Sequence, residues 1–349
     1  MISFNVKHLS NGLTFIHHYD QNTNLCVTNL LYNVGARDED PNKTGFAHLF
    51  EHLMFGGSVN IPSFDTPLQK ASGENNAFTS NDITNYYITL PSDNIETALW
   101  LESDRMLRLD FSEKSLNTQK GVVIEEFKQR YLNHPYGDAW LHLRPLAYKT
   151  HPYQWPTIGK EISHIENANL EEVIKFFETY YNPSNAVLCI AGNIDFEKAF
   201  MLCEKWFGGI PAGPINKNHY PEEPSPTLRC EKTIDANVPQ DAFYMAFHMV
   251  DRIHPLYFAF DMLSDILSGS ESSRFTNILV KDKEIFSHVH AYITGDIDKG
   301  LFVVEGKLND KIEFELAESS VLEILKDISE HGLSEQELQK VKNKSLTSN

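Results

Sequence analysis

Along the first half of the chain, apolar residues show two spacing patterns, which alternate along the sequence. Apolar residues at every second position, or in short unbroken runs, predict β-strands, whereas apolar residues three or four positions apart predict helices. The predicted strands cover residues 13–19, 25–34, 85–91 and 186–194. The predicted helices cover residues 44–55, 94–108, 112–132, 170–181 and 195–206. Strands and helices mixed in this way predict an α+β fold.

A cluster of chain breakers divides the chain. Residues 208–227 contain five prolines and almost no apolar periodicity, which predicts a linker. A chain of 349 residues also exceeds the length at which one hydrophobic core keeps growing. We therefore predict a first domain at residues 1–210, a Pro-rich linker at 211–227 and a second domain at 228–349.

After the linker the order of elements restarts. A predicted strand at residues 241–249 is followed by a helix that opens at Pro255 and closes in the Gly-Ser turn 267–273. Aligning the sequence of this turn with the turn after the first predicted helix places Phe260, Leu263 and Ser264 opposite His48, Glu51 and His52. These last three residues can carry chemistry, whereas the first three cannot form the same site. The two halves are therefore predicted to be similar, with the chemistry in the first half alone.

The end of the sequence gives a separate expectation. Ser334 and Glu337 have the spacing of a capping box, which predicts a helix. The chain stops about four helical turns later in a polar stretch. We expect the second domain to be incomplete at its C-terminus.

Composition narrows the classes of partner. Thirty basic and 48 acidic residues give a formal net charge of −18, which would repel nucleic acid. No apolar run approaches the eighteen or so residues of a membrane span, and the first residues lack the pattern of a signal peptide. We therefore expect no nucleic-acid or membrane partner and a cytoplasmic location. The four cysteines lack the CxxC spacing of thiolate zinc sites.

The segment His48-Leu-Phe-Glu51-His52 carries the strongest chemical signal. Residues four apart share one face of a helix, so the two imidazoles would project side by side and could hold one metal ion. A catalytic zinc takes three protein ligands and keeps a fourth position for water, whose pKa it lowers to about 7. Glu51 would then be free to act as the general base that takes a proton from this water.

Neighbouring residues support a short, well-bounded helix. Thr44 offers an N-cap, Gly45 precedes the predicted helix, and Gly56 and Gly57 follow it. The H-x-x-E-H order is that of inverted zinc peptidases. The alternative interpretation is an ordinary solvated helix face, because fifteen histidines make a chance match possible.

A third ligand is expected from the helix capped by Ser112. Glu125 and Glu126 interrupt its otherwise apolar stretch. Adjacent helical residues point about 100° apart, so only one of the two can face the metal. Periodicity does not choose between them.

Five segments together resemble one family of enzymes, the inverzincin peptidases of the pitrilysin and mitochondrial-processing-peptidase type (peptidase family M16). They are NVGARDEDPNKTGFAHLFEHLMFGGS, ENNAFTSNDITNYYITLP, QKGVVIEEFKQR, HPYQWPTIGKEISHI and YYNPSNAVLCIAGNID. The similarity runs over nearly the whole chain and is strongest over residues 30–195. It implies two similar domains of the M16 and LuxS-like fold, each an antiparallel sheet with packed helices.

The resemblance also assigns roles. It implies a zinc endopeptidase, with one Zn²⁺ per chain, that cleaves internal bonds of extended peptides or unfolded polypeptides. Glu126 matches the third ligand, and Gln119 stands where the family usually has a glutamate that supports the site. An edge strand would bind the substrate backbone through Asn76, Ala77, Phe78 and Thr79.

A partner follows from the same resemblance. Two such two-domain units are expected to close on a substrate like a clamshell, as a homodimer or as a heterodimer with a related subunit. Two alternatives remain: a non-catalytic or partner-dependent family member that serves as a scaffold, and a peptide-binding module whose HLFEH segment is only a helix face. The presence of His48, Glu51, His52 and Glu126 favours the enzyme.

Overall fold

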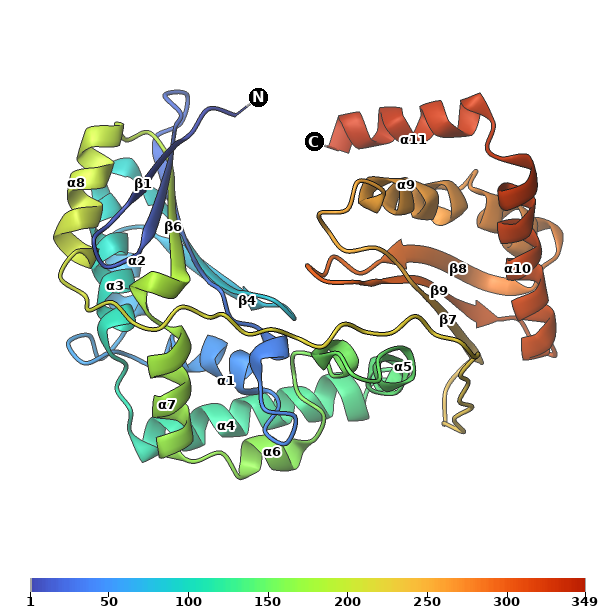
Figure 1. The fold of residues 1–349 in the computed structure, drawn as a ribbon, viewed down its shortest axis with the longest axis horizontal. Coiled ribbons are helices and arrows are strands. Elements are labelled where there is room, and N and C mark those ends of the chain that lie inside the picture. Colours follow the sequence, from blue (N-terminus) through green and yellow to red (C-terminus); the bar gives the residue numbers. More distant parts are fainter. Residues whose placement is uncertain (1, 349) are drawn as a thin grey trace. The chain divides into compact units, whose positions relative to one another are not determined.

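A computed structural model describes residues 2–348 (Figure 1). The chain forms two compact units. Unit 1 consists of the residues up to Arg130 and of His151–Pro221, and unit 2 consists of Tyr131–Thr150 and the residues from Glu222 onward. Each unit combines a β-sheet with helices, so the predicted α+β fold class is confirmed.

Unit 1 is built on a six-stranded sheet. In spatial order its strands are β1 (Asn5–His8), β2 (Thr14–Tyr19), β6 (Ala186–Gly192), β3 (Leu25–Tyr32), β5 (Thr84–Pro91) and β4 (Glu74–Thr79). Alternation in β3 places Cys26, Thr28, Leu30 and Tyr32 on one buried face. The sequence therefore determines which face of the sheet meets the core.

One strand pair departs from the expected antiparallel sheet. β2 and β6 run parallel, with Ile16 opposite Cys189, whereas the other neighbouring strands of this sheet run antiparallel. The sheet is therefore mixed. Parallel neighbours need a long crossover connection, and here the connection contains most of unit 1.

In the described structure, unit 1 also contains seven α-helices: α1 (Phe46–Leu53), α2 (Asp65–Lys70), α3 (Ile95–Leu107), α4 (Glu113–Phe127), α6 (Ile162–Glu166), α7 (Leu170–Tyr180) and α8 (Phe196–Phe207). Helix α3 packs on β3 and β5, and α8 packs on β2. Short 3-10 turns lie at η1 (Ala36–Asp38), η2 (Ser92–Asn94), η4 (Pro152–Gln154) and η5 (Pro183–Asn185). The five helices predicted for this half are present, and their ends agree within a few residues.

Aromatic packing holds α1 in unit 1. The Phe50 ring of α1 lies 5.0 Å from the Phe176 ring of α7 and 5.0 Å from the Tyr181 ring, measured between centroids. Phe50 is fully buried. The lower part of unit 1 in Figure 1 shows α1, α4, α6 and α7 grouped on this side.

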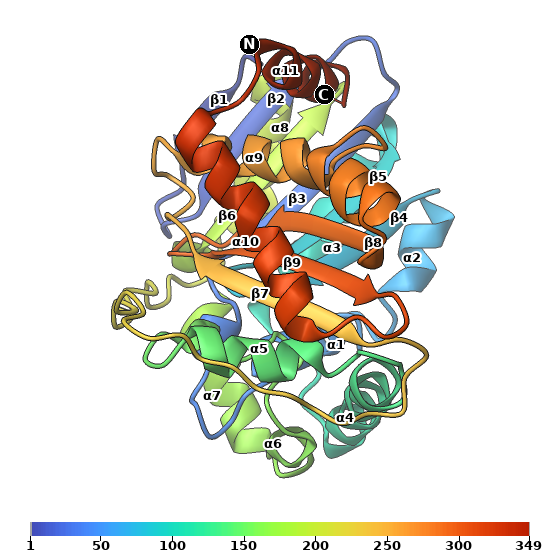
Figure 2. The same cartoon turned by 90° about the vertical axis from the view of Figure 1, so that its right-hand side faces the viewer.

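Unit 2 contains a three-stranded sheet. Its strands, in spatial order, are β7 (Ala242–His248), β9 (Leu301–Leu308) and β8 (Phe286–Ile293). Its helices are α5 (Ala139–Ala147), α9 (Tyr257–Ser268), α10 (Phe314–His331) and α11 (Glu335–Ser348), with a π-helical turn η6 (Thr276–Asp282). Helices α9 and α10 lie over one face of the sheet (Figure 2) and bury an apolar core that includes Leu267, Val304 and Val321.

The two units share a strand and helix order. In unit 1 the succession β3, α1, β4, β5 gives the spatial order β3-β5-β4, and in unit 2 the succession β7, α9, β8, β9 gives β7-β9-β8. Two similar halves, as predicted, are therefore present. Ser334 and Glu337 also form the predicted capping box, with a distance of 3.2 Å between the Glu337 amide nitrogen and Ser334 Oγ and 2.9 Å between the Ser334 amide nitrogen and Glu337 Oε2.

The unit boundary falls inside the predicted linker, and one segment from the first half belongs to unit 2. Helix α5 lies within residues 131–150 and packs on β7, which places this segment with unit 2. In the predicted linker, Asn216 Nδ2 donates a 2.6 Å hydrogen bond to Asp38, and Tyr220 also bonds this carboxylate. The first part of the linker is therefore attached to unit 1.

Within residues 2–348, no helix is both long enough and apolar enough to cross a bilayer.

Candidate active site

Helix α1 presents the paired histidines. His48 and His52 lie one turn apart, with ring centroids separated by 4.9 Å and ring planes at 89°. The apolar residues of the helix, Phe46, Ala47, Leu49, Phe50 and Leu53, are all buried. Because the apolar face is anchored in the core, the polar face that carries the imidazoles has a fixed direction.

The start of α1 is built differently from the prediction. Gly45, not Thr44, is the N-cap, with φ at +91°, a left-handed conformation that glycine adopts without steric cost. The Thr44 hydroxyl instead accepts a 2.8 Å hydrogen bond from the backbone N–H of Lys160. A Cβ at Gly45 would lie 2.7 Å from the Ile158 carbonyl oxygen, and one at Gly159, where φ is +98°, would lie 2.9 Å from the Thr44 carbonyl oxygen.

A buried carboxyl group takes over the capping role. Glu39 is 6 % exposed and accepts hydrogen bonds from the backbone N–H groups of Gly45 at 2.9 Å and Ala47 at 2.8 Å. The indole N–H of Trp155 donates a third bond at 3.1 Å. Burial raises the pKa of Glu39 to about 8, against the opposing effect of these donors. Glu39 thereby satisfies backbone groups at the helix start that would otherwise lack partners.

Glu126 of α4 completes a three-residue cluster. Its Oε2 atom lies 3.5 Å from Nε2 of His48 and 3.4 Å from Nε2 of His52. The neighbouring Glu125 is turned outward, where it pairs with Lys128 at 2.8 Å. Of the two glutamates that periodicity left open, Glu126 is the one that the structure brings to the histidines.

The donor set fits zinc. Zinc–nitrogen and zinc–oxygen bonds of about 2.0–2.2 Å at tetrahedral angles place ligand atoms roughly 3.3–3.5 Å apart. The measured Nε2–Oε2 separations of 3.5 and 3.4 Å match this, and the three ligand atoms all lie within 4.8 Å of one another. Among the described residues, no other group of three histidine, cysteine or acidic side chains converges in this way.

The protonation states also suit a metal. Burial lowers the pKa of His48 to about 4, so this imidazole is neutral near pH 7. The hydrogen bond from His52 holds the pKa of Glu126 below its ordinary value, so the carboxylate is ionised. Two imidazoles and one carboxylate form a ligand type typical of catalytic zinc sites.

Glu51 stands next to the cluster but outside it. Thr79 Oγ1, at the end of β4, donates a 2.5 Å hydrogen bond to Glu51 Oε2. Glu51 is half-buried and keeps its second carboxylate oxygen for other partners. The proposed general base is therefore connected to the strand that was predicted to hold the substrate.

Asn76, Ala77, Phe78 and Thr79 all lie in β4. This strand is at the edge of the sheet and pairs only with β5 in the described structure. Phe78 is 47 % exposed. The expected edge strand is present, and its use by a substrate stays a prediction.

Some residues of the site could not be anticipated. Glu39 and Trp155 carry no local motif that points to α1. Arg130 lies four residues after Glu126 and bonds its Oε1 atom at 2.9 Å, a spacing that is visible in the sequence. Gln119 lies two turns before Glu126 on α4 and is half-buried.

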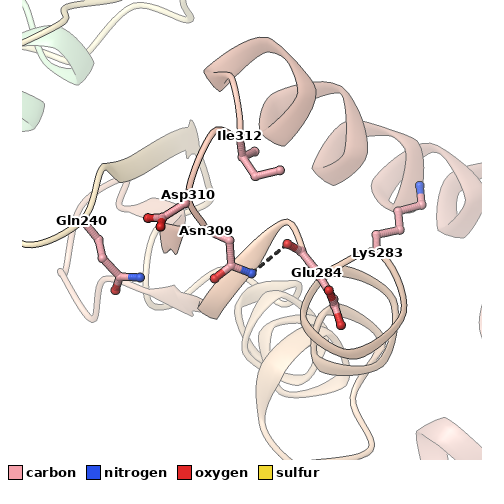
Figure 3. Close-up of a pocket in the computed structure, with 6 residues that line it drawn as sticks. All are labelled: Gln240, Lys283, Glu284, Asn309, Asp310 and Ile312. Carbon is pink, nitrogen blue, oxygen red and sulfur yellow. Dashed lines mark hydrogen bonds between the residues drawn. The ribbon is translucent and has the colours of Figure 1, made fainter.

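Two hollows at the surface differ in the residues that line them. One of about 660 Å³ runs beside Glu126 and is lined by Thr118, Gly121, Val122, Glu125, Gln129 and Arg130. Figure 3 shows another, of about 610 Å³, in unit 2. Its labelled side chains do not converge, and the bond drawn there joins Asn309 to the backbone oxygen of Glu284 at 2.7 Å. Of these two hollows, the one in unit 1 contains a residue of the cluster.

Comparison with known families agrees with this geometry. Residues 14–159 match the model described as Insulinase (Peptidase family M16), and residues 167–345 match the Peptidase M16 inactive domain. The chain belongs to peptidase family M16. All three cluster residues and Glu51 lie within the first match, and the second match covers most of unit 2.

Individual M16 relatives are distant in sequence. The chain is 29 % identical over 342 residues to the zinc protease PqqE of Helicobacter pylori. This match covers 96 % of the chain and 76 % of that protein. It is 27 % identical over 257 residues to the mitochondrial-processing peptidase subunit beta of Saccharomyces cerevisiae, covering 72 % of the chain and 55 % of the relative. The crystal structure of a protease from Helicobacter pylori superposes with a TM-score of 0.92 and 27 % identity, covering 100 % of the chain and 85 % of that structure.

Proposed function

We propose that this chain is a zinc-dependent endopeptidase that hydrolyses internal peptide bonds of extended peptides or unfolded polypeptides. The observation that carries the proposal is the convergence of His48, His52 and Glu126, with Glu51 beside them. Relatives named zinc proteases support the choice of metal. His48, His52 and Glu126 would hold one zinc ion.

A bound zinc would supply two effects: it would lower the pKa of a water molecule and polarise the carbonyl group of the substrate. Glu51 would accept the proton of the attacking water and pass it to the leaving amine. The hydrogen bond from Thr79 holds one carboxylate oxygen of Glu51, so the other oxygen remains the proton acceptor. The chain's own contribution is therefore a positioned base next to three metal ligands.

Strand β4 would bind the substrate as an added strand. Its outer edge offers backbone N–H and C=O groups, which bind an extended peptide whatever its side chains are. Thr79 connects this edge directly to Glu51. Such an edge favours extended segments as substrates, because their backbone groups are free to pair with it.

A second subunit is part of the proposal. One relative is by its name a subunit of a processing peptidase, which supports a dimer of this chain with itself or with a related chain. Light scattering of the purified protein measures this directly. A monomer that cleaves peptides at the full rate would remove the need for a partner.

The function is tested by replacing Glu51 with glutamine. We expect the variant to keep about one zinc per chain and to lose about 10²–10⁴-fold in kcat on a quenched fluorescent peptide, because the base is absent while the ligands remain. Glu125→Gln serves as the matched control, since Glu125 is an exposed glutamate that does not belong to the cluster. Metal content is measured by atomic absorption.

His52→Ala should lose both the metal and the activity. Equal cleavage with and without Glu51 would refute the general-base role. A wild-type chain that binds no zinc, yet binds peptides, would be the non-catalytic peptide-binding module instead.

A further inference from the structure

The two carboxylate oxygens of Glu126 have different partners. Oε2 faces both histidines, at 3.5 and 3.4 Å. Oε1 is 2.9 Å from Nη1 of Arg130. The carboxylate therefore presents one oxygen to the histidine pair, while an arginine holds the other.

Local structure explains how Arg130 reaches this position. Helix α4 is followed by a π-helical turn, η3 (Lys128–Leu132), and Arg130 lies within it. A residue four positions after Glu126 is close enough for its side chain to fold back along the helix. Turns of the π type are frequent at functional sites, where they shift the direction of side chains.

Stability gives no clear reason for this ion pair. The Arg130 side chain is 73 % exposed, and exposed ion pairs contribute little to folding. Arg130 and Glu126 instead line the same hollow, of about 660 Å³, at the surface of α4. The guanidinium is thus placed where it acts on the ligand and not on the core.

We propose that Arg130 is a positioning residue that keeps Glu126 a one-oxygen ligand. The proposal rests on the zinc site of the proposed function. A carboxylate beside a divalent cation can bind through one or both oxygens. A catalytic zinc with three protein ligands needs its remaining position open for water or substrate. By holding Oε1, Arg130 prevents the second oxygen from becoming an additional ligand beside that position.

The lysine at position 128 is the natural control. Lys128 also forms an ion pair with a glutamate of α4, Glu125, at 2.8 Å, but this glutamate is not part of the histidine cluster. Lys128→Ala removes the same charge from the same turn. Any effect of long-range electrostatics would therefore appear in both variants, and an effect of positioning only in Arg130→Ala.

The test measures metal binding without using activity. Zinc affinity is determined by competition with a chromophoric chelator for the full chain and for Arg130→Ala, Arg130→Gln and Lys128→Ala. We expect about a tenfold loss of affinity in both Arg130 variants, the lower end of what loss of a ligand's hydrogen-bond partner produces. We expect no change in Lys128→Ala. Arg130→Gln decides the outcome if Arg130→Ala does not fold.

Cobalt substitution supplies a signature that a merely structural role would not change. Co²⁺ with four ligands absorbs visible light more strongly than Co²⁺ with five. The Arg130 variants should therefore show weaker visible bands than the wild-type protein. Arg130 variants with wild-type zinc affinity and a wild-type cobalt spectrum would overturn this inference alone, whereas a wild-type chain without metal affinity would overturn the proposed function as well.

Discussion

Replacing Glu39 with alanine tests how α1 is held. The substitution removes the acceptor of the Gly45 and Ala47 amide groups, while the Trp155 indole keeps the Ala36 carbonyl oxygen as a partner at 3.0 Å. Each buried donor left without a partner costs about 1–3 kcal/mol. The free energy of unfolding should therefore fall by about 2–6 kcal/mol, a large share of the stability of an ordinary domain.

Asp195→Ala provides the matched comparison. Asp195 is also an acidic cap, since its side chain accepts a 2.9 Å hydrogen bond from the Lys198 amide at the start of α8, but it is exposed to solvent. Loss of such a cap costs about 1 kcal/mol. The difference between the two variants measures the effect of burial.

Urea unfolding of the metal-free protein at about pH 5.5, followed by tryptophan fluorescence, is the assay. Of the four tryptophans, Trp100, Trp155 and Trp206 lie in unit 1, so the signal reports mainly on that unit. If Glu39→Ala lost no more stability than Asp195→Ala, the capping role of Glu39 would be refuted. A weaker zinc affinity in the Glu39 variant would further connect this cap to the histidines.

Three further predictions concern the pH dependence, the base and the core. Because the pKa of Glu39 is raised from 4.5 to about 8, its contribution to stability is full below pH 4.5 and is lost as the pH rises through about 8. The effect of Glu39→Ala on urea midpoints should therefore be larger at pH 5 than at pH 8, and an equal effect would contradict the raised pKa. Thr79→Val should lower kcat by about tenfold with unchanged zinc content, because a hydrogen bond to a charged group is lost, whereas Thr79→Ser should retain activity. Arg105→Ala should destabilise unit 1 by about 3–5 kcal/mol in the same unfolding assay. The substitution leaves the buried carboxylate of Glu102 without its 2.7 Å partner. A loss of stability below about 1 kcal/mol would show that the pair is dispensable.

Local features of the sequence predicted local structure well. The C-terminal end of α1 was predictable because Gly56 and Gly57 follow it, whereas the capping of its start by Glu39 was not. Ser112 also caps the start of α4, as predicted, and its hydroxyl accepts a 3.2 Å hydrogen bond from the Ser115 amide. These features depend on a few neighbouring residues, which sequence periodicity describes directly.

Features that depend on distant packing were not predictable from residues alone. The choice between Glu125 and Glu126 depends on how α4 is rotated against α1, which no spacing within α4 reports. The parallel pairing of β2 with β6 joins segments about 170 residues apart. Helix α5 was not predicted, and Pro145 inside it weakens the helical pattern of its sequence.

Two glycines, Gly45 before α1 and Gly159 in the segment packed against it, have a consequence for any survey of variants. Gly45 and Gly159 carry no functional group, yet a side chain at either would collide with backbone oxygen atoms of the opposite segment at 2.7 or 2.9 Å. In a saturation library scored for peptide cleavage, both positions should therefore be as intolerant as the metal ligands. When the same library is scored for soluble protein, variants at Gly45 and Gly159 should be lost as misfolded protein, whereas variants at His48 and His52 should remain.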